Sequence, residues 1–368
     1  MVHHWNEKKI GLSGCTFREI LKINEGKILK IPGYNIDLEE AVKIIKENNY
    51  KRVVLQIPEG LKSHFSKFVE FLENRTNESI IISADPCFGA CDTISSEFKN
   101  LGIDFVLQIG HTKIPNIKDF PIPILFINAK ADIEISEIIK KTIPALIGKK
   151  IGLITTAQHI DLLDEVIKIL KNNNFNPVIG KGDSRIELKG QILGCNFSAA
   201  TSIASKVDSF LFIGDGNFHP LGLLLITKKP VIVYDPYTLE VKGKELNDLK
   251  DMILRQRYGA IARSKDADVF GILVGTKIGQ QRIDLAYEIK EKLKSKQKKS
   301  FILAANHFLP AHLESFRDID CFVSTACPRI AIDDYMQYKK PIITPVELEI
   351  LLGYKKWEDY HFYEILDL

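Results

Sequence analysis

Six cysteines carry the most distinctive chemistry of this 368-residue chain. They are Cys15, Cys87, Cys91, Cys195, Cys321 and Cys327. Disulfide-stabilised proteins are small, secreted and far denser in cysteine, so we expect free thiols or metal ligands. A closed zinc site usually contains a local CxxC pair, and this sequence has none. The CxxxCxxC run of ordinary radical enzymes is also missing.

Three of these cysteines lie in loops rich in small residues. Cys91 stands in ADPCFGACD, Cys195 in GQILGCN and Cys327 in STACPR. A single free cysteine is often only a small apolar core residue, so each alone is weak evidence. Three thiolates that leave one coordination position open would suit an iron–sulfur cluster whose fourth iron binds a substrate or cofactor.

The elements that would position these loops recur three times along the chain. Each repeat contains an apolar strand, a helical pattern, a short strand, a second helix and two further strands. An acidic residue opens the third strand of each repeat, and these residues are Asp104, Asp208 and Asp320. Such alternation predicts parallel sheets with right-handed crossovers.

We therefore expect an α/β protein of three homologous domains, each a small, mostly parallel, four-stranded sheet flanked by helices. The predicted divisions are an N-terminal arm (1–30) and repeats over 31–143, 144–265 and 266–368. Ligands of open parallel sheets bind at the carboxyl ends of the strands, where all three loop cysteines are expected. A pseudo-threefold arrangement of the repeats would bring the thiols to one central cluster.

The composition argues against several classes of function. A hydrophobic fraction of 45% and a charged fraction of 26% are ordinary for a folded globular protein. The net charge of +3 gives no reason to expect nucleic-acid binding. No stretch approaches eighteen consecutive apolar residues and no signal peptide is evident, so we expect a cytoplasmic protein that does not enter a membrane.

Several stretches together resemble a known family. They include QIPEG from Gln56, FGACD from Phe88, QILGC from Gln191, IGDGNFHP from Ile213, GTKIGQ from Gly275, STACPRIAIDD from Ser324 and TPVE from Thr344. On these residues the chain resembles archaeal diphthamide synthase subunits, which are 3-amino-3-carboxypropyl transferases. The resemblance implies three homologous domains that each give one cysteine to a 4Fe-4S cluster.

The resemblance also implies which cysteines bind the cluster. The family's ligand in the first domain follows Gly-Ala, which here selects Cys91 over Cys87. The implied ligands are Cys91, Cys195 and Cys327. We expect the other three cysteines to be structural, with Cys87 as the weaker alternative to Cys91 as a ligand.

The implied reaction is the first step of diphthamide biosynthesis on elongation factor 2. An electron from the reduced cluster breaks the Cγ–S bond of S-adenosylmethionine, and the 3-amino-3-carboxypropyl fragment attaches to an imidazole carbon of one histidine. Methylthioadenosine is the by-product. The resemblance further implies an electron donor as a partner and a homodimeric enzyme.

Five polar residues are candidates for binding the cofactor, namely His111, His219, Arg329, Gln280 and Asp215. The two histidines follow Asp-led strands and would face the same crevice, or would only cap turns. Arg329 would bind the cofactor carboxylate through a bidentate contact, or would pair with Asp333 or Asp334. The GDG sequence around Asp215 is also an ordinary turn.

Two other functions fit part of the pattern. One is a quinolinate synthase-like iron–sulfur dehydratase, which would need neither S-adenosylmethionine nor a protein substrate. The other is a non-catalytic, cluster-binding scaffold subunit. FGACD and STACPRIAIDD favour the diphthamide interpretation over the first alternative, and the complete set of three cysteines argues against the second.

Overall fold

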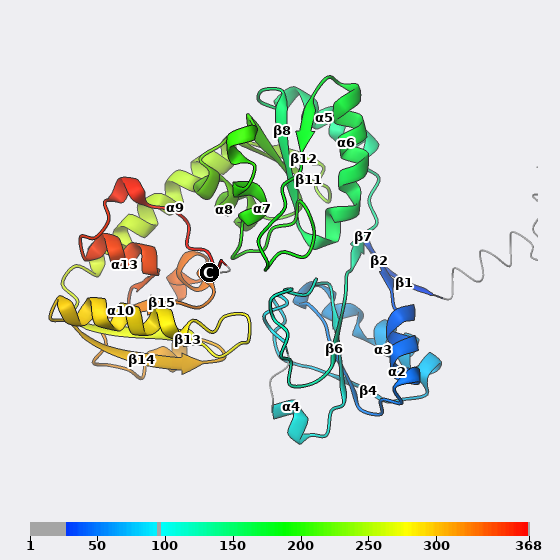
Figure 1. Cartoon of the computed structure of the whole chain (residues 1–368), viewed down its shortest axis with the longest axis horizontal. Coiled ribbons are helices and arrows are strands. Elements are labelled where there is room, and N and C mark those ends of the chain that lie inside the picture. Colours follow the sequence, from blue (N-terminus) through cyan, green and yellow to red (C-terminus); the bar gives the residue numbers. More distant parts are fainter. Residues whose placement is uncertain (1–26, 94–96, 367–368) are drawn as a thin grey trace, which may run out of the picture.

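The computed structural model describes residues 27–93 and 97–366. Three mostly parallel sheets, each with helices on both faces, lie around a common centre (Figure 1). This arrangement confirms the predicted α/β class. The domain boundaries and the pseudo-threefold symmetry stay predictions. No helix in the described part of the chain is long and apolar enough to cross a membrane.

The first sheet is four-stranded and parallel, in the order β4-β3-β5-β6. Its strands are β3 (Val53–Gln56), β4 (Ile80–Ile82), β5 (Phe105–Ile109) and β6 (Ile124–Ile127). Helices α2 (Glu39–Glu47) and α3 (Phe65–Thr76) pack on one face, and Phe98 of α4 (Glu97–Asn100) packs on the other. Because both faces are covered, the strands are mainly apolar rather than alternating, with the buried Gln56 and Gln108 as exceptions.

The second sheet has five strands, in the order β12-β11-β10-β8-β9. They are β8 (Lys150–Thr155), β9 (Asn176–Val178), β10 (Ser209–Ile213), β11 (Val231–Asp235) and the antiparallel β12 (Glu240–Lys242). The expected count of four was wrong for this unit. The Asp235 carboxylate accepts hydrogen bonds from the backbone N–H groups of Tyr237 and Thr238, and this turn folds the chain back along β11.

Helices again cover both faces of the second sheet. One face carries α7 (Ser198–Thr201), α8 (Phe218–Thr227) and α9 (Lys244–Arg263), and the other carries α5 (Ser136–Thr142) and α6 (Leu163–Asn172). Three short 3₁₀ segments complete the unit: η2 (Ile143–Ala145), η3 (Ala157–Leu162) and η4 (Ala204–Lys206). The long helix α9 continues from this unit into the third (Figure 1).

The third sheet is four-stranded and parallel, in the order β14-β13-β15-β16. Its strands are β13 (Val269–Gly275), β14 (Lys299–Ala305), β15 (Cys321–Ser324) and β16 (Ile342–Ile343). Helices α10 (Ile283–Ser295) and α13 (Pro345–Leu351) pack on one face, and α11 (Pro310–Leu313) and α12 (Pro328–Ile332) on the other. The 3₁₀ segments η5 (Tyr335–Gln337) and η6 (Trp357–Asp359) flank α13, and η1 (Glu59–His64) precedes α3 of the first unit.

The recurring aspartates have one structural role in all three units. Each carboxylate accepts hydrogen bonds of 2.8–3.1 Å from two consecutive backbone N–H groups at the start of the neighbouring strand. Asp104 binds residues 51 and 52, Asp208 binds residues 149 and 150, and Asp320 binds residues 268 and 269. Donors at a strand start that lack ladder partners are thereby satisfied.

Two features were not expected from the sequence. A small antiparallel sheet of β1 (Ile28–Ile31), β2 (Tyr34–Asp37) and β7 (Lys130–Ala131) stands beside the first unit. The C-terminal tail returns to the second unit, where Phe362 packs on Phe197 and Phe218. The arm predicted over residues 1–30 lies mostly outside the described residues, apart from the first part of β1.

Candidate functional site

The three loop cysteines come from the three different sheets. Cys91 follows β4, Cys195 follows β9, and Cys327 follows β15 at the start of α12. Burial is the main cause that raises the pKa of each thiol, to about 12 for Cys327. The negative charges of Cys195 and Cys327 further raise the pKa of Cys91, and that of Cys195 raises the pKa of Cys327. These mutual effects indicate that the three thiols, each partly buried, lie near one another.

The loop after β13 presses against Cys91. The Gln280 amide Nε2 donates a hydrogen bond to the Cys91 Sγ at 3.2 Å. A Cβ placed on Gly279 would lie 2.7 Å from the Cβ of Cys91, so only glycine allows this approach. The structure thus places Gln280 at a predicted ligand, while its role toward a cofactor stays a prediction.

A buried ion pair stands directly beside Cys91. Lys277, also in the loop after β13, pairs with the Asp92 carboxylate, and their side chains are only 9% and 3% exposed. The other Asp92 oxygen accepts the backbone N–H of Phe88 at 2.8 Å. The pair joins the first unit to the third at the edge of the candidate site.

Cys195 is bordered by a second, separate set of polar contacts. Asp183 accepts hydrogen bonds from the Asn196 side chain and from the backbone N–H of Arg185, at 2.8 and 2.9 Å. The Arg185 guanidinium in turn donates to the carbonyl oxygen of Gly279 at 3.1 Å. Arg185 also lowers the pKa of Cys195 against the effect of burial. The Arg185–Gly279 hydrogen bond joins the second unit to the third.

The C-terminal tail closes the site from a further side. The backbone N–H of Ile365 donates to the carbonyl of Cys195 at 2.7 Å, and the Tyr363 hydroxyl donates to the carbonyl of Thr325 at 3.0 Å. Burial, with added effects of the Cys195 and Cys327 charges, raises the pKa of Tyr363 to about 12. The tail therefore fixes the loops of two of the three cysteines.

The two predicted histidines have different neighbours. The Nδ1 of His111 is 3.8 Å from the Sγ of Cys87. His219 stacks on Phe212, and its Nε2 is 3.7 Å from the position that a Cβ on Gly194 would take. Burial lowers the pKa of both imidazoles to about 4, so both are neutral at physiological pH.

The two remaining candidates, Arg329 and Asp215, differ in their contacts. Arg329 donates from Nε to the Asp333 carboxylate at 2.8 Å and lies 4.9 Å above the Phe218 ring, so the internal pairing foreseen for it is present. Asp215 is exposed, and its charge acts on the pKa values of His159 and Tyr237. We find no hydrogen bond or ion pair between Asp215 and the cysteines in the described residues.

The other cysteines lie in different surroundings. Cys87 is buried and receives a hydrogen bond of 3.6 Å from the Gln108 amide, and burial raises its pKa to about 12. Cys321 is fully buried in the core of the third unit and contacts the Ser264 hydroxyl at 3.2 Å. Cys15 lies outside the described residues.

The donor set fits a cluster better than a single ion. Among the described residues, no three His, Cys, Asp or Glu side chains are close enough together to bind one metal ion. A four-iron cluster makes a different demand, because each protein thiolate binds a different iron. Three separate, partly buried thiols, on loops where Gly89 and Gly279 leave room beside Cys91, meet that demand.

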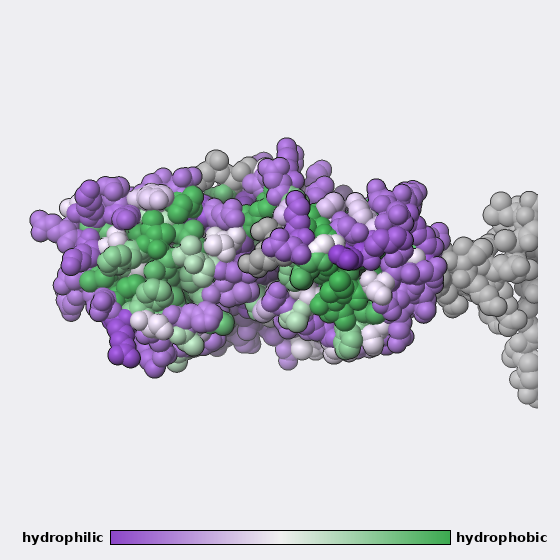
Figure 2. Space-filling view, turned by 90° about the horizontal axis from the view of Figure 1, so that it is seen from below, coloured by the Kyte–Doolittle hydropathy of each residue, from purple (hydrophilic) through white to green (hydrophobic). Residues whose placement is uncertain are grey.

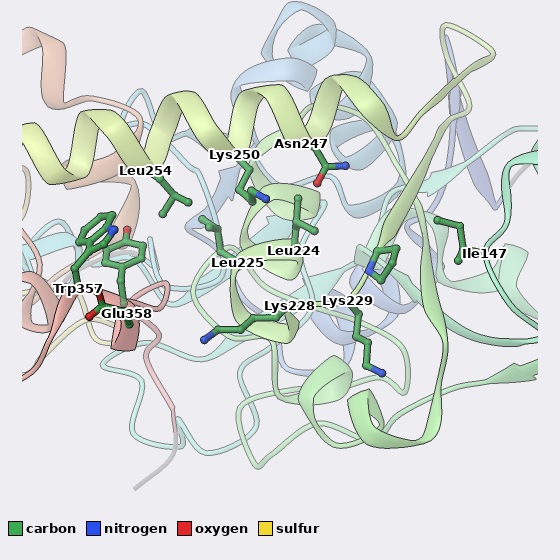
Figure 3. A pocket seen from close by; sticks show the side chains of 12 residues that line it. Ile147, Leu224, Leu225, Lys228, Lys229, Asn247, Lys250, Leu254, Trp357 and Glu358 are labelled. Carbon is green, nitrogen blue, oxygen red and sulfur yellow. The ribbon is translucent and has the colours of Figure 1, made fainter.

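A hollow of about 680 Å³ elsewhere in the molecule involves none of these residues. It lies between α8, α9 and the η6 segment, with Leu224 and Leu254 inside it and Lys228 and Lys229 near its edge (Figure 3). Cavity volume therefore does not identify the cysteine loops as the candidate site.

Comparison with known proteins decides the family. The family of diphthamide synthesis proteins matches residues 57–361, which is most of the chain. This chain belongs to that family. The resemblance carried by its sequence motifs is thus confirmed.

Similar proteins match over nearly their whole length. A 2-(3-amino-3-carboxypropyl)histidine synthase from Pyrococcus horikoshii is 37% identical, over 90% of this chain and 94% of that protein. The Methanocaldococcus jannaschii protein of the same name is 32% identical, over 90% and 93%. The crystal structure of Dph2 from Pyrococcus horikoshii with a 4Fe-4S cluster superposes with a TM-score of 0.81 at 36% identity, covering 92% of this chain and 95% of that one.

Sequence reasoning missed several residues of the site. Asp92 and Lys277 stand inside the motifs FGACD and GTKIGQ, so a charged pair within otherwise apolar or small residues was a usable signal. Arg185 and Tyr363 had no such signal. Their roles depend on contacts with distant segments.

Proposed function

We propose that this protein is a 2-(3-amino-3-carboxypropyl)histidine synthase. It transfers the 3-amino-3-carboxypropyl group of S-adenosylmethionine to a histidine of elongation factor 2, the first step of diphthamide biosynthesis. The observation that carries the proposal is that three partly buried thiols from three different sheets lie near one another. The similarity to synthases of that name over 90% of the chain supports it.

Cys91, Cys195 and Cys327 are the residues that would hold a 4Fe-4S cluster, the group that the similar Dph2 structure contains. When bound, the cluster would supply the electron for reductive Cγ–S cleavage and one open coordination position. Gln280 fixes the Cys91 sulfur through its amide. The tail holds the Cys195 loop through the backbone of Ile365, and the Lys277–Asp92 pair stands beside Cys91.

The choice of the Cγ–S bond requires that the chain orient its cosubstrate. Arg329 is the candidate for the carboxylate, because its side chain is 49% exposed and only its Nε is used by Asp333. The neutral His219 beside it can donate or accept one hydrogen bond without adding charge. His111 beside Cys87 and Gln280 beside Cys91 are the corresponding candidates in the first unit's loop, and no contact among the described residues supports such a role for Asp215.

The proposed reaction requires two protein partners, elongation factor 2 and an electron donor, which places the enzyme in the cytoplasm. We also propose a homodimer. Figure 2 shows hydrophobic residues gathered in two areas of one face. Exposed apolar side chains of the third unit include Phe301, Leu309 and Phe316, at 53%, 52% and 43% exposure, and such side chains are suited to a partner subunit.

Product analysis tests the proposal. Anaerobically reconstituted protein is reduced and incubated with S-adenosylmethionine, and we expect methylthioadenosine as the nucleoside product. Mainly 5′-deoxyadenosine would refute the proposed bond cleavage. No product from a protein with a complete, reducible cluster would favour the non-catalytic scaffold, while the match to the diphthamide family already weighs against the quinolinate synthase-like alternative.

A further inference from the structure

Two arginines are buried in the described part of the chain, and they differ in how their charge is matched. Arg257 is fully buried, and its Nε and one terminal nitrogen donate to the two oxygens of Glu347 at 2.8 and 2.7 Å. The carbonyls of Ala331 and Ile342 accept its remaining hydrogen bonds. Arg257 is therefore a neutralised structural clamp.

Arg185 is 7% exposed and lacks such partners. One terminal nitrogen donates to the Gly279 carbonyl, but Nε has no hydrogen-bond acceptor among the described residues. In the same residues its guanidinium forms no ion pair. A buried cation with a free N–H group is costly unless an anion meets it. The carboxylates of the described residues do not supply this anion.

The position of Arg185 indicates which group supplies the anion. Asp183 ties the Arg185 backbone to the side chain of Asn196, the residue next to Cys195. Among the neighbouring charged groups, Arg185 changes the pKa of Cys195 the most, and it lowers that pKa. Its contact with Gly279 brings it to the loop that covers Cys91. A thiolate sulfur at Cys195 would supply the missing negative charge and the missing acceptor.

We propose that Arg185 is the counter-ion of metal-bound Cys195 and donates a hydrogen bond to its sulfur. This role rests on the proposed function, because it requires a ligated thiolate. Hydrogen bonds to ligand sulfurs and nearby positive charge favour the reduced, more negative state of an iron–sulfur centre. Arg185 is thus a positioning residue that acts through Cys195 and raises the reduction potential.

The test is an anaerobic redox titration followed by EPR. Arg185→Met removes charge and hydrogen bonds, and Arg185→Lys keeps only the charge. We expect Arg185→Met to shift the reduction equilibrium about tenfold toward the oxidised state, which is about 59 mV for one electron. Arg185→Lys should recover part of this shift. Arg263→Met, which removes an exposed charge at the end of α9, should leave the potential unchanged.

The outcomes separate this role from the function on which it rests. An unchanged potential in Arg185→Met, with full iron content, overturns the role alone. A wild-type protein that binds no iron or sulfide overturns the proposed function and this role with it. Thermal melting of the metal-free proteins adds a further criterion: Arg185→Met should melt near the wild type, whereas Arg257→Met should melt well below it. Equal losses in the two variants would make Arg185 a structural clamp.

Discussion

The buried Lys277–Asp92 pair allows the sharpest stability prediction. Asp92→Asn removes one charge and leaves the Lys277 ammonium, 9% exposed, without its counter-ion. Breaking a buried pair by removing one partner costs about 3–5 kcal/mol. By contrast, the Lys339–Glu314 pair is 77% and 43% exposed, so Glu314→Gln should cost at most about 1 kcal/mol.

Guanidinium chloride unfolding of the metal-free variants is the appropriate assay, with the midpoints compared because several packed units need not unfold in one step. A double variant, Asp92→Asn with Lys277→Met, should lose less than the sum of the two single variants, since it no longer buries an unpaired charge. If Asp92→Asn behaves like Glu314→Gln, or if the two single effects simply add, the pair does not hold the first and third units together.

The remaining predictions concern the ligands, the packing and pH. Alanine at any one of the three proposed ligand cysteines should abolish iron and sulfide binding, whereas Cys321→Ala should keep the iron and lose about 1–2 kcal/mol of stability; iron retained in all three ligand variants would contradict the assignment. Gly279→Ala should also lose iron, because its Cβ would clash with Cys91, while Gly259→Ala in α9 has open space and should be neutral or stabilising; metal analysis and melting curves distinguish them. Burial raises the pKa of Glu364 from 4.5 to about 7, so its protonated form favours folding and this stabilisation disappears as the pH rises from about 4.5 to 7. Glu364→Gln should flatten that part of the curve of unfolding free energy against pH. At pH 8 its free energy of unfolding should exceed that of the wild type by about 1–3 kcal/mol, and an unchanged curve would argue against the raised pKa of Glu364.

The fold class was predictable because its determinants are local. Runs such as VVLQ in β3 and SFLFI in β10 are mainly apolar and are buried at every position, as is typical of strands covered on both faces. The aspartate before each central strand marked the repeat, and the structure supplies its reason in hydrogen bonds to the neighbouring strand start. The positions of the cysteine loops could be predicted because the loops come after these predicted strands.

What the sequence could not show depends on contacts between distant segments. The tail around Phe362 has no helical or alternating pattern, yet it belongs to the core of the second unit. Arg185 lies in a loop without a recognisable motif, and its unpaired guanidinium is visible only in three dimensions. The fifth strand of the second sheet was likewise missed, because Asp235 and Pro236 mark a turn but do not show that the short segment after it pairs back on β11.

Transfer of label to the protein substrate tests the central claim most directly. Reduced enzyme is incubated anaerobically with S-adenosylmethionine labelled in its carboxypropyl portion and with archaeal elongation factor 2, or with a variant that lacks the target histidine. The proposed function predicts label in the wild-type factor, none in the variant, and one methylthioadenosine for each group transferred. Equal labelling of both proteins, or no labelling by enzyme with an intact and reducible cluster, would contradict it.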